Sequence, residues 1–245
     1  MSSAPTAPSS AWSERELATL ALLAETFVRG GATRRATLMA QAIDRLDPSQ
    51  ARQLRLVLRL IESRTANRVL GARWSAFRDL GPAAREAYLV AWGDSRFALR
   101  RSAYQAFKRL ACFLAYADPG DAIANPLWDR IGYRSPMQPL TKEPTPIVAY
   151  DPGRAAADGP VTIDADAVIV GSGAGGGLIA AELARAGRSV VVLEAGPLVT
   201  EPDMPTDELA AFDRLYLDHG LSATWDGAIS VLAGSCVGGG TTVNW

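Results

Sequence analysis

Three glycines follow the G-x-G-x-x-G spacing at Gly171, Gly173 and Gly176, directly after the apolar stretch AVIV. In a dinucleotide site the first glycine permits a tight turn, the second lets the backbone approach a pyrophosphate, and the third lets helix and strand pack closely. The amides that begin the following helix then face the phosphates with the positive end of the helix dipole. The spacing therefore predicts a dinucleotide phosphate site formed by Gly171, Ser172, Gly173, Ala174, Gly175 and Gly176.

An acidic residue, Glu194, ends a second apolar stretch about 20 residues after the glycine motif, where the dinucleotide fingerprint requires one. A carboxylate at this place accepts hydrogen bonds from the hydroxyls of an adenosine ribose and repels a 2′-phosphate. We therefore expect Glu194 and its neighbour Ala195 to contact a ribose without a 2′-phosphate, which disfavours NADP. The alternative interpretation is a glycine turn that only packs a helix against a sheet.

A second glycine-rich segment, GSCVGGGTTVNW, occupies 234–245. Bare glycines let backbone amides come within hydrogen-bond distance of ligand oxygens because no Cβ intervenes. We expect a loop here that brings backbone close to a ligand. We interpret Cys236 as a small filler of this tight segment rather than as a redox thiol. The sequence shows no nucleophilic triad, metal-ligand cluster or pair of acid and base carboxylates, so we predict no catalytic residue and no metal ligand.

These motifs need a β-α-β unit to position them, and the sequence supplies one. DADAVIV is typical of a buried strand, LIAAELARAG of a helix that ends at Gly187, and RSVVVLEAG of a second buried strand. The unit has about 30 residues, the length that a parallel crossover requires.

The sequence before residue 135 is typical of an all-helical region. Ser13 and Glu16 have capping-box spacing, and Asp47 with Pro48 marks the start of another helix. Prolines then gather in 135–160 and predict an extended connector. The expected fold class is α + α/β. The expected domains are a disordered tail at 1–12, a helical domain at 13–134, a Pro-rich connector at 135–160 and a partial dinucleotide-binding domain at 161–245.

Composition and charge narrow the class of protein. The chain is 48% hydrophobic and 21% charged, as in soluble globular proteins. Residues 1–134 carry 20 Lys and Arg against 12 Asp and Glu, whereas 135–245 carry 5 against 14, which supports two parts of different character. The arginines of the basic part are dispersed among acids, so we expect no nucleic-acid partner. We find no signal peptide and no apolar run that spans a bilayer, and expect a cytoplasmic protein; peripheral membrane contact and oligomeric state stay open.

GSGAGGG, VVVLEAG and the later AGSCVGGGTTVNW together resemble the glucose-methanol-choline (GMC) family of FAD-dependent oxidoreductases. Within it they are most similar to the long-chain fatty alcohol oxidase-like branch. SRTANRVLG and NPLWDRIGY, in the helical part, resemble the N-terminal region of that branch, which is also likened to the small subunit of gluconate 2-dehydrogenase. The resemblance implies the first β-α-β unit of an FAD-binding Rossmann-like domain, incomplete at the C-terminus.

The resemblance implies that the first glycine motif and Glu194 contact the FAD pyrophosphate and adenosine ribose. The second motif would run beside the flavin, through Gly238, Gly239, Gly240, Thr241, Thr242 and Asn244. Some relatives bond flavin covalently to a histidine just before this asparagine, whereas this chain has Val243, which implies non-covalent FAD.

The implied reaction is hydride transfer from an alcohol carbon, in long-chain alcohols by resemblance, to flavin N5. The family's catalytic histidine stands far toward the C-terminus, and the only histidine here, His219, matches no such motif. We therefore expect an N-terminal fragment of the enzyme. Two alternatives stay open: a non-catalytic nucleotide-binding or interaction module, and one subunit of a split flavoenzyme.

Overall fold

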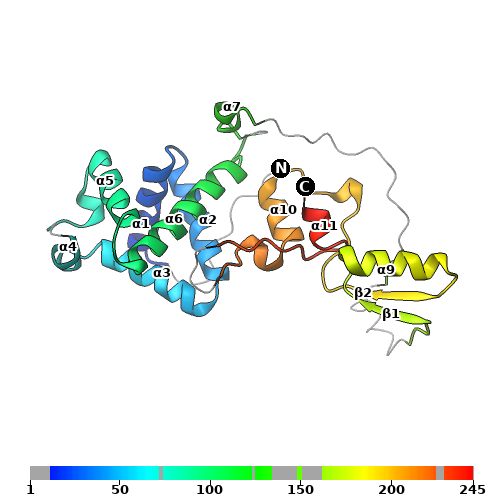
Figure 1. The fold of residues 1–245 in the computed structure, drawn as a ribbon. Helices are drawn as coiled ribbons and strands as arrows, with labels where there is room; N and C mark the ends of the chain where they lie inside the picture. The colour runs from blue at the N-terminus through cyan, green and yellow to red at the C-terminus, as the bar shows by residue number, and fades with distance from the viewer. Residues whose placement is uncertain are drawn as a thin grey trace. The chain divides into compact units, whose positions relative to one another are not determined.

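The computed structural model describes residues 12–71, 74–122, 125–133, 148–150, 162–224 and 229–244. They belong to two compact units, one formed by 1–135 with 223–230 and the other by 136–222 with 231–245. The first unit is helical, and the second contains a small parallel sheet (Figure 1). Of the predicted disordered tail at 1–12 only Trp12 is described, and of the predicted connector at 135–160 only 148–150, so both predictions fall almost entirely outside the described residues.

The first unit is a series of helices, two of which start at the predicted capping residues. Ser13 accepts a hydrogen bond from the Glu16 amide at 3.2 Å while the Glu16 carboxylate accepts from the Ser13 amide at 3.0 Å. Asp47 caps the third helix by accepting from the Ser49 amide at 2.8 Å. The elements are α1 (Glu14–Phe27), α2 (Ala32–Arg45), α3 (Pro48–Ile61), α4 (Arg64–Gly71), η1 (Phe77–Asp79), α5 (Pro82–Gly93), α6 (Ala98–Ala117) and α7 (Trp128–Ile131).

The core of the helical unit lies where α1 packs against α2 and α6. Leu20 and Leu23 of α1 and Met39 and Ile43 of α2 are fully buried there. Burial of apolar side chains is the dominant favourable contribution to folding, so this helix cluster stabilises the unit. Further buried apolar side chains come from α3, η1 and α6: Val57, Leu58, Ile61, Phe77, Phe107 and Leu114.

A buried polar network ties α4 to its surroundings. The Asn67 side-chain amide donates to the carbonyls of Ile61 and Ser75, both at 2.8 Å. Its carbonyl oxygen accepts from the Tyr88 hydroxyl at 2.7 Å. Every side-chain group of Asn67 that forms these bonds is withdrawn from water, since the residue is only 4% exposed. Such a network stabilises one arrangement of the helices because each broken bond leaves a buried polar group unpaired.

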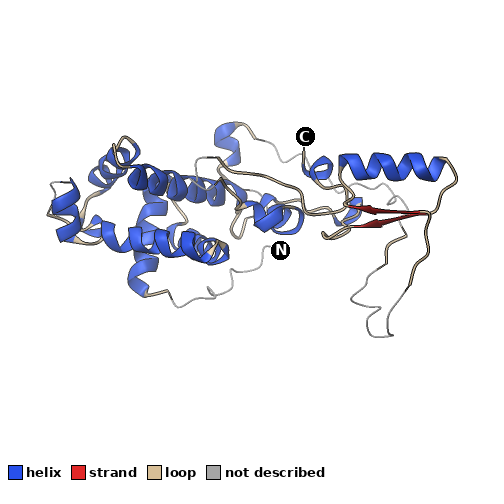
Figure 2. Cartoon of the chain, turned by 60° about the horizontal axis from the view of Figure 1, so that its bottom comes forward, coloured by secondary structure: helices blue, strands red, loops and turns tan. Residues whose placement is uncertain are grey.

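The second unit contains strands β1 (Ala167–Val170) and β2 (Val190–Leu193), joined by helix α9 (Ala174–Arg185). The strands are parallel, with Ala167 opposite Val190 and Val170 opposite Leu193. Figure 2 shows the two strand arrows pointing the same way, with α9 alongside them. A helical N-terminal region followed by a parallel two-stranded sheet is the architecture that the sequence predicts.

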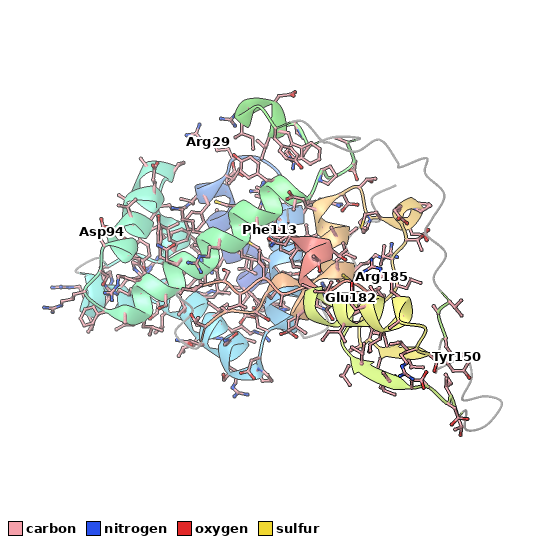
Figure 3. All side chains as sticks on the ribbon, turned by 45° about the vertical axis from the view of Figure 1, so that its right-hand side comes forward. Arg29, Asp94, Phe113, Tyr150, Glu182 and Arg185 are labelled. Carbon is pink, nitrogen blue, oxygen red and sulfur yellow. The ribbon has the colours of Figure 1, made fainter. Side chains whose placement is uncertain are left out.

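The structure corrects the predicted start of the crossover helix. The stretch LIAAELARAG placed this helix after the glycines, from Leu178 onward, but α9 begins at Ala174. Gly173 is the N-cap residue, and the glycines that follow it form the first turn of the helix. The reason is that the turn off β1 is completed within three residues, which leaves the later glycines free to adopt helical angles. On the outer face of α9, Glu182 and Arg185 form an exposed ion pair (Figure 3).

The remaining elements of this unit are short: η2 (Glu201–Asp203), α10 (Glu208–Leu215), η3 (Leu217–Gly220) and α11 (Gly240–Val243). The predicted loop at 234–245 is therefore partly wrong, since its second half forms the helical turn α11. The reason is a set of local hydrogen bonds, such as that from the Asn244 amide to the Gly240 carbonyl at 2.8 Å.

The apolar surface of the β-α-β segment is open. Val168 and Val170 of β1 are 60% and 84% exposed, and Leu178 of α9 is 63% exposed. Buried apolar side chains of this unit, among the described residues, are Leu215 and Cys236. Parallel sheets are ordinarily covered on both faces, so this surface is of the kind that further protein covers. Across the described parts of both units, no helix combines the length and the apolar character that crossing a membrane requires.

Candidate functional site

The first glycine motif forms the turn between β1 and α9. Gly171 has a φ of +88°, which side-chain-bearing residues rarely adopt, and its amide extends the sheet by donating to the Leu193 carbonyl at 2.8 Å. Gly173 has extended angles at the N-cap of α9, and no side chain caps the helix there. The first amides of a helix have no acceptor within it. The turn therefore directs uncapped N–H donors and a positive dipole end away from the sheet.

Gly176 is required by close packing. A Cβ at this position would lie 2.0 Å from the Gly171 carbonyl oxygen and 3.2 Å from Cγ2 of Ile169. A Cβ at Gly173 or Gly175 would meet no atom within 4 Å. The third glycine thus lets α9 approach β1, while the second leaves open space above the backbone, where a large group such as a phosphate can come close.

Glu194 follows β2 and bonds to the glycine turn. Its Oε2 accepts from the Ser172 amide at 2.9 Å and from the Ser172 hydroxyl at 2.6 Å, and its Oε1 accepts from the Gly196 amide at 2.9 Å. The Ser172 hydroxyl, followed by the Gly196 and Ser172 amides, lowers the pKa of this carboxyl to about 2. Glu194 is therefore ionised at neutral pH and held at the edge of the phosphate turn.

The two glycine segments meet in the second unit. The Gly238 amide donates to the Ser172 hydroxyl at 2.9 Å. A Cβ on Gly239, which has a φ of +53°, would lie 3.2 Å from the Cα of Gly173. Figure 1 shows α11 beside the N-terminal end of α9. Residues more than 60 positions apart thus form one continuous backbone surface, with Glu194 at its edge.

The polar side chains of the second segment bond within it. The Thr241 hydroxyl donates to the Gly238 carbonyl at 2.6 Å, and the Thr242 hydroxyl donates to the Val237 carbonyl at 2.8 Å. Both bonds rigidify the turn around Gly238–Gly240, so these threonines shape the backbone. Gly240, Thr241, Thr242 and Asn244 are exposed, as are Ala174, Gly175 and Ala195 of the other predicted set.

Two further glycines support the site, and the motif spacing did not reveal them. A Cβ on Gly196 would lie 2.3 Å from the Ser235 carbonyl carbon and oxygen. A Cβ on Gly234 would lie 2.3 Å from the Gly239 carbonyl oxygen. The backbone after β2 is therefore pressed against the second segment. Gly196 directly follows the Glu194-Ala195 pair, which is the signal that could have drawn attention to it.

His219 lies at the surface, and Cys236 is buried. His219 lies in η3 with a φ of 56°, and its Nδ1 is 2.9 Å from Asp213 Oδ1. Its side chain is 43% exposed, as expected for a loop residue. Cys236 is 1% exposed, and burial raises the pKa of its thiol. Within the part of the chain that the structure describes, no three His, Cys, Asp or Glu side chains gather as a metal site would need.

This arrangement fits a dinucleotide. Uncapped helix amides and open space at Gly173 suit a pyrophosphate, and an ionised carboxylate beside them suits a ribose diol. The second segment extends the surface beyond the phosphate turn, so it offers backbone to the part of a ligand that lies past the pyrophosphate.

Comparison with known proteins agrees with this geometry. Residues 169–228 match the NAD(P)-binding Rossmann-like domain family. The long-chain-alcohol oxidase FAO4A of Arabidopsis thaliana is 30% identical over 205 residues, which is 66% of this chain and 28% of the relative. The long-chain-alcohol oxidase FAO4B of the same plant is 50% identical over 98 residues, or 40% of this chain and 13% of the relative.

Bacterial relatives extend the comparison. An uncharacterized GMC-type oxidoreductase of Mycobacterium tuberculosis is 46% identical over 90 residues, which is 36% of this chain and 14% of the relative. No solved structure matches the chain. The chain matches only part of the length of the plant relatives, 28% of FAO4A and 13% of FAO4B. The homologues are thus long-chain-alcohol oxidases and GMC-type oxidoreductases, and the resemblance inferred from the motifs is confirmed.

Proposed function

We propose that this chain, as a homologue of long-chain-alcohol oxidases and GMC-type oxidoreductases, forms the FAD-binding part of an oxidoreductase that acts on the CH–OH group of alcohols. The observation that carries the proposal is the joined backbone surface. The Gly238 amide bonds to Ser172, and Ser172 bonds to Glu194. A pyrophosphate turn, a ribose carboxylate and a second glycine segment are the three parts that one extended dinucleotide needs.

Different residues of the chain would contact different parts of the cofactor. The α9 amides that follow Gly173 would hold the pyrophosphate, and Glu194 would accept from the adenosine ribose. The backbone at Gly238–Gly240 would lie along the flavin. Val243 has no nucleophilic atom with which to bond flavin covalently, which supports a dissociable FAD.

FAD, when bound, supplies the acceptor for hydride from the alcohol carbon. The chain's own contribution is to bind and orient it: the glycine turns fix the backbone, and the Glu194 carboxylate fixes the ribose. We assign no catalytic residue among those described. A long-chain alcohol is the substrate class that we propose, and it rests on the names of the plant relatives.

We also propose the domain organisation expected from the sequence, with a helical domain at 13–134 and a partial FAD-binding domain at 161–245. The free thiols of Cys112 and Cys236 favour a reducing compartment, which supports a cytoplasmic site of action.

The proposal is tested by titrating the purified chain with FAD and following flavin fluorescence, with Glu194→Ala as the variant and Glu182→Ala as its control. Glu182 lies on the exposed surface of α9, where its carboxylate pairs with Arg185. We expect saturable binding that Glu194→Ala weakens and Glu182→Ala leaves unchanged. Equal affinity in all three proteins would overturn the ribose assignment.

The open apolar surface favours a second candidate, in which the chain is one subunit of a split flavoenzyme. Val168, Val170 and Leu178 would then be covered by a separate chain that carries the catalytic residues. Reading the coding DNA beyond the Trp245 codon separates the two arrangements. An open frame that continues into a histidine-containing domain contradicts the split enzyme, and a stop codon there favours it.

A further inference from the structure

We propose that Ser172 is a positioning residue whose hydroxyl couples the ribose carboxylate of Glu194 to the second glycine segment at Gly238. This inference rests on the proposed function, because it takes Glu194 and the two glycine segments as parts of one cofactor site. It adds a role to a residue that the G-x-G-x-x-G pattern leaves unspecified, since position two of that motif has no required side chain.

The geometry of the hydroxyl carries the proposal. Ser172 Oγ lies 2.6 Å from Glu194 Oε2 and 2.9 Å from the Gly238 amide nitrogen. A serine hydroxyl has one proton and two lone pairs. A carboxylate only accepts, so the proton must be donated to Glu194. The lone pairs of the hydroxyl then remain for the Gly238 amide. The direction of both hydrogen bonds is therefore fixed: Gly238 donates to Ser172, and Ser172 donates to Glu194.

The charge of Glu194 strengthens both bonds. Hydrogen bonds to an ionised acceptor are shorter and stronger than neutral ones, and neighbouring bonds in a chain polarise one another. The pKa of the Glu194 carboxyl is lowered, so the group stays ionised at neutral pH. Its negative charge thus makes the Ser172 oxygen a better acceptor for Gly238, so a change at the carboxylate is transmitted to the second segment.

The neighbouring contacts show why this link matters. Gly239 approaches Gly173 so closely that an added Cβ would lie 3.2 Å from the Gly173 Cα. Gly239 and Gly173 gain nothing from side-chain packing with each other, because neither residue has a side chain. The Val237 amide, which donates to the Pro197 carbonyl at 3.0 Å, holds the second segment to the loop after β2. The Ser172 hydroxyl adds the directed bond that joins this segment to the phosphate turn, and Glu194 sets the direction of that hydroxyl.

The test compares Ser172→Ala with the conservative Ser172→Thr, which retains a hydroxyl, in the full chain. Hydrogen exchange of the Gly238 amide reports the link without any cofactor. The Gly239 amide, which donates to the Cys236 carbonyl at 2.8 Å, serves as the internal control, and the Gly171 amide reports that the sheet is intact. We expect Gly238 to exchange at least about tenfold faster in Ser172→Ala, with Gly239 and Gly171 unchanged and Ser172→Thr like the parent.

A second readout is affinity for FAD and for ADP, measured by titration of the same proteins. We expect Ser172→Ala to weaken FAD binding by about tenfold and ADP binding less, because ADP does not extend past the phosphates to the second segment. A positioning role predicts this difference between ligands, and a general loss of stability does not. Glu194→Gln should also accelerate Gly238 exchange, because the neutral amide polarises the hydroxyl less.

The outcomes separate this inference from the function on which it rests. Parental exchange at Gly238 in Ser172→Ala, parental FAD affinity in that variant, or a Ser172→Thr variant that behaves like Ser172→Ala overturns the positioning role. Accelerated exchange at Gly238 together with a parent chain that binds neither FAD nor ADP supports the link and contradicts the proposed cofactor function instead.

Discussion

Replacing Gly176 by alanine sets two effects of opposite sign against each other. Alanine favours a helix interior over glycine by about 1 kcal/mol, so propensity alone predicts a more stable α9. The new Cβ would lie 2.0 Å from the Gly171 carbonyl oxygen, however, and that oxygen belongs to the backbone of the turn. The helix and the strand must separate by about 1 Å or more, and overpacking of this kind costs about 1–3 kcal/mol.

Gly175 provides the matched control because it lies in the same turn of α9. A Cβ there would meet nothing within 4 Å, so Gly175→Ala gains helix propensity without overlap. The difference between the two variants therefore isolates the overlap, and we expect Gly176→Ala to be less stable than Gly175→Ala by about 1–3 kcal/mol.

The assay is native-state hydrogen exchange of the β1 and β2 amides, which reports the free energy of opening of this unit separately from the helical unit. The expected difference corresponds to roughly five- to 150-fold faster exchange in Gly176→Ala than in Gly175→Ala. Equal exchange in the two variants would refute the packing role of the third glycine, and with it the close approach of α9 to β1.

Three further predictions follow from named contacts. Because the pKa of Glu194 falls from 4.5 to about 2 on folding, its carboxylate should stabilise the second unit above pH 4.5, and this contribution should be lost as the pH falls toward 2. Acid unfolding of the parent and of Glu194→Gln measures the effect. An unchanged pH profile in the variant contradicts it. Asn67→Ala should lower the free energy of unfolding of the helical unit by about 2–4 kcal/mol, and Tyr88→Phe by about 1 kcal/mol, because only the first leaves several buried partners unpaired. Urea denaturation measures both losses, and equal losses would refute the network. Ser13→Ala should lower the stability of α1 by about 1 kcal/mol, because it removes the N-cap hydrogen bond. The Glu16 amide should then exchange faster with solvent. Unchanged exchange of this amide would mean that the capping box does not form in solution.

The start of a helix was predictable where a side chain caps it. Ser13 with Glu16 and Asp47 with Pro48 fix the starts of α1 and α3 because the capping bonds are local in sequence. Helix α2 has no such signal: its N-cap is Gly31 in a left-handed conformation, with no capping side chain. In its first turn the buried Arg35 donates to the carbonyl oxygens of Val28 and Gly30, which follow the end of α1, and no sequence pattern indicates these bonds.

The candidate site was predictable to the extent that its parts are local motifs. The spacing of Gly171, Gly173 and Gly176 indicates the strand-turn-helix geometry, because each glycine acts within this turn. The bond between Ser172 and Gly238 joins residues far apart in the sequence, and no pattern in either segment indicates it. The close contact of Gly196 with Ser235 is similar, since a single glycine has many possible causes. Long-range backbone contacts are set by packing of the whole unit, and sequence periodicity does not report them.

The most direct test of the central claim is hydrogen exchange of the chain with FAD, ADP, NAD or NADP added. The proposed site predicts that FAD protects both the turn at Gly171–Gly176 and the segment at Gly238–Gly240, because one ligand spans the two. ADP should protect the first more than the second, and NADP should protect neither, because Glu194 repels its 2′-phosphate. Equal protection by FAD and NADP, or FAD protection that leaves Gly238–Gly240 unchanged, would contradict the account.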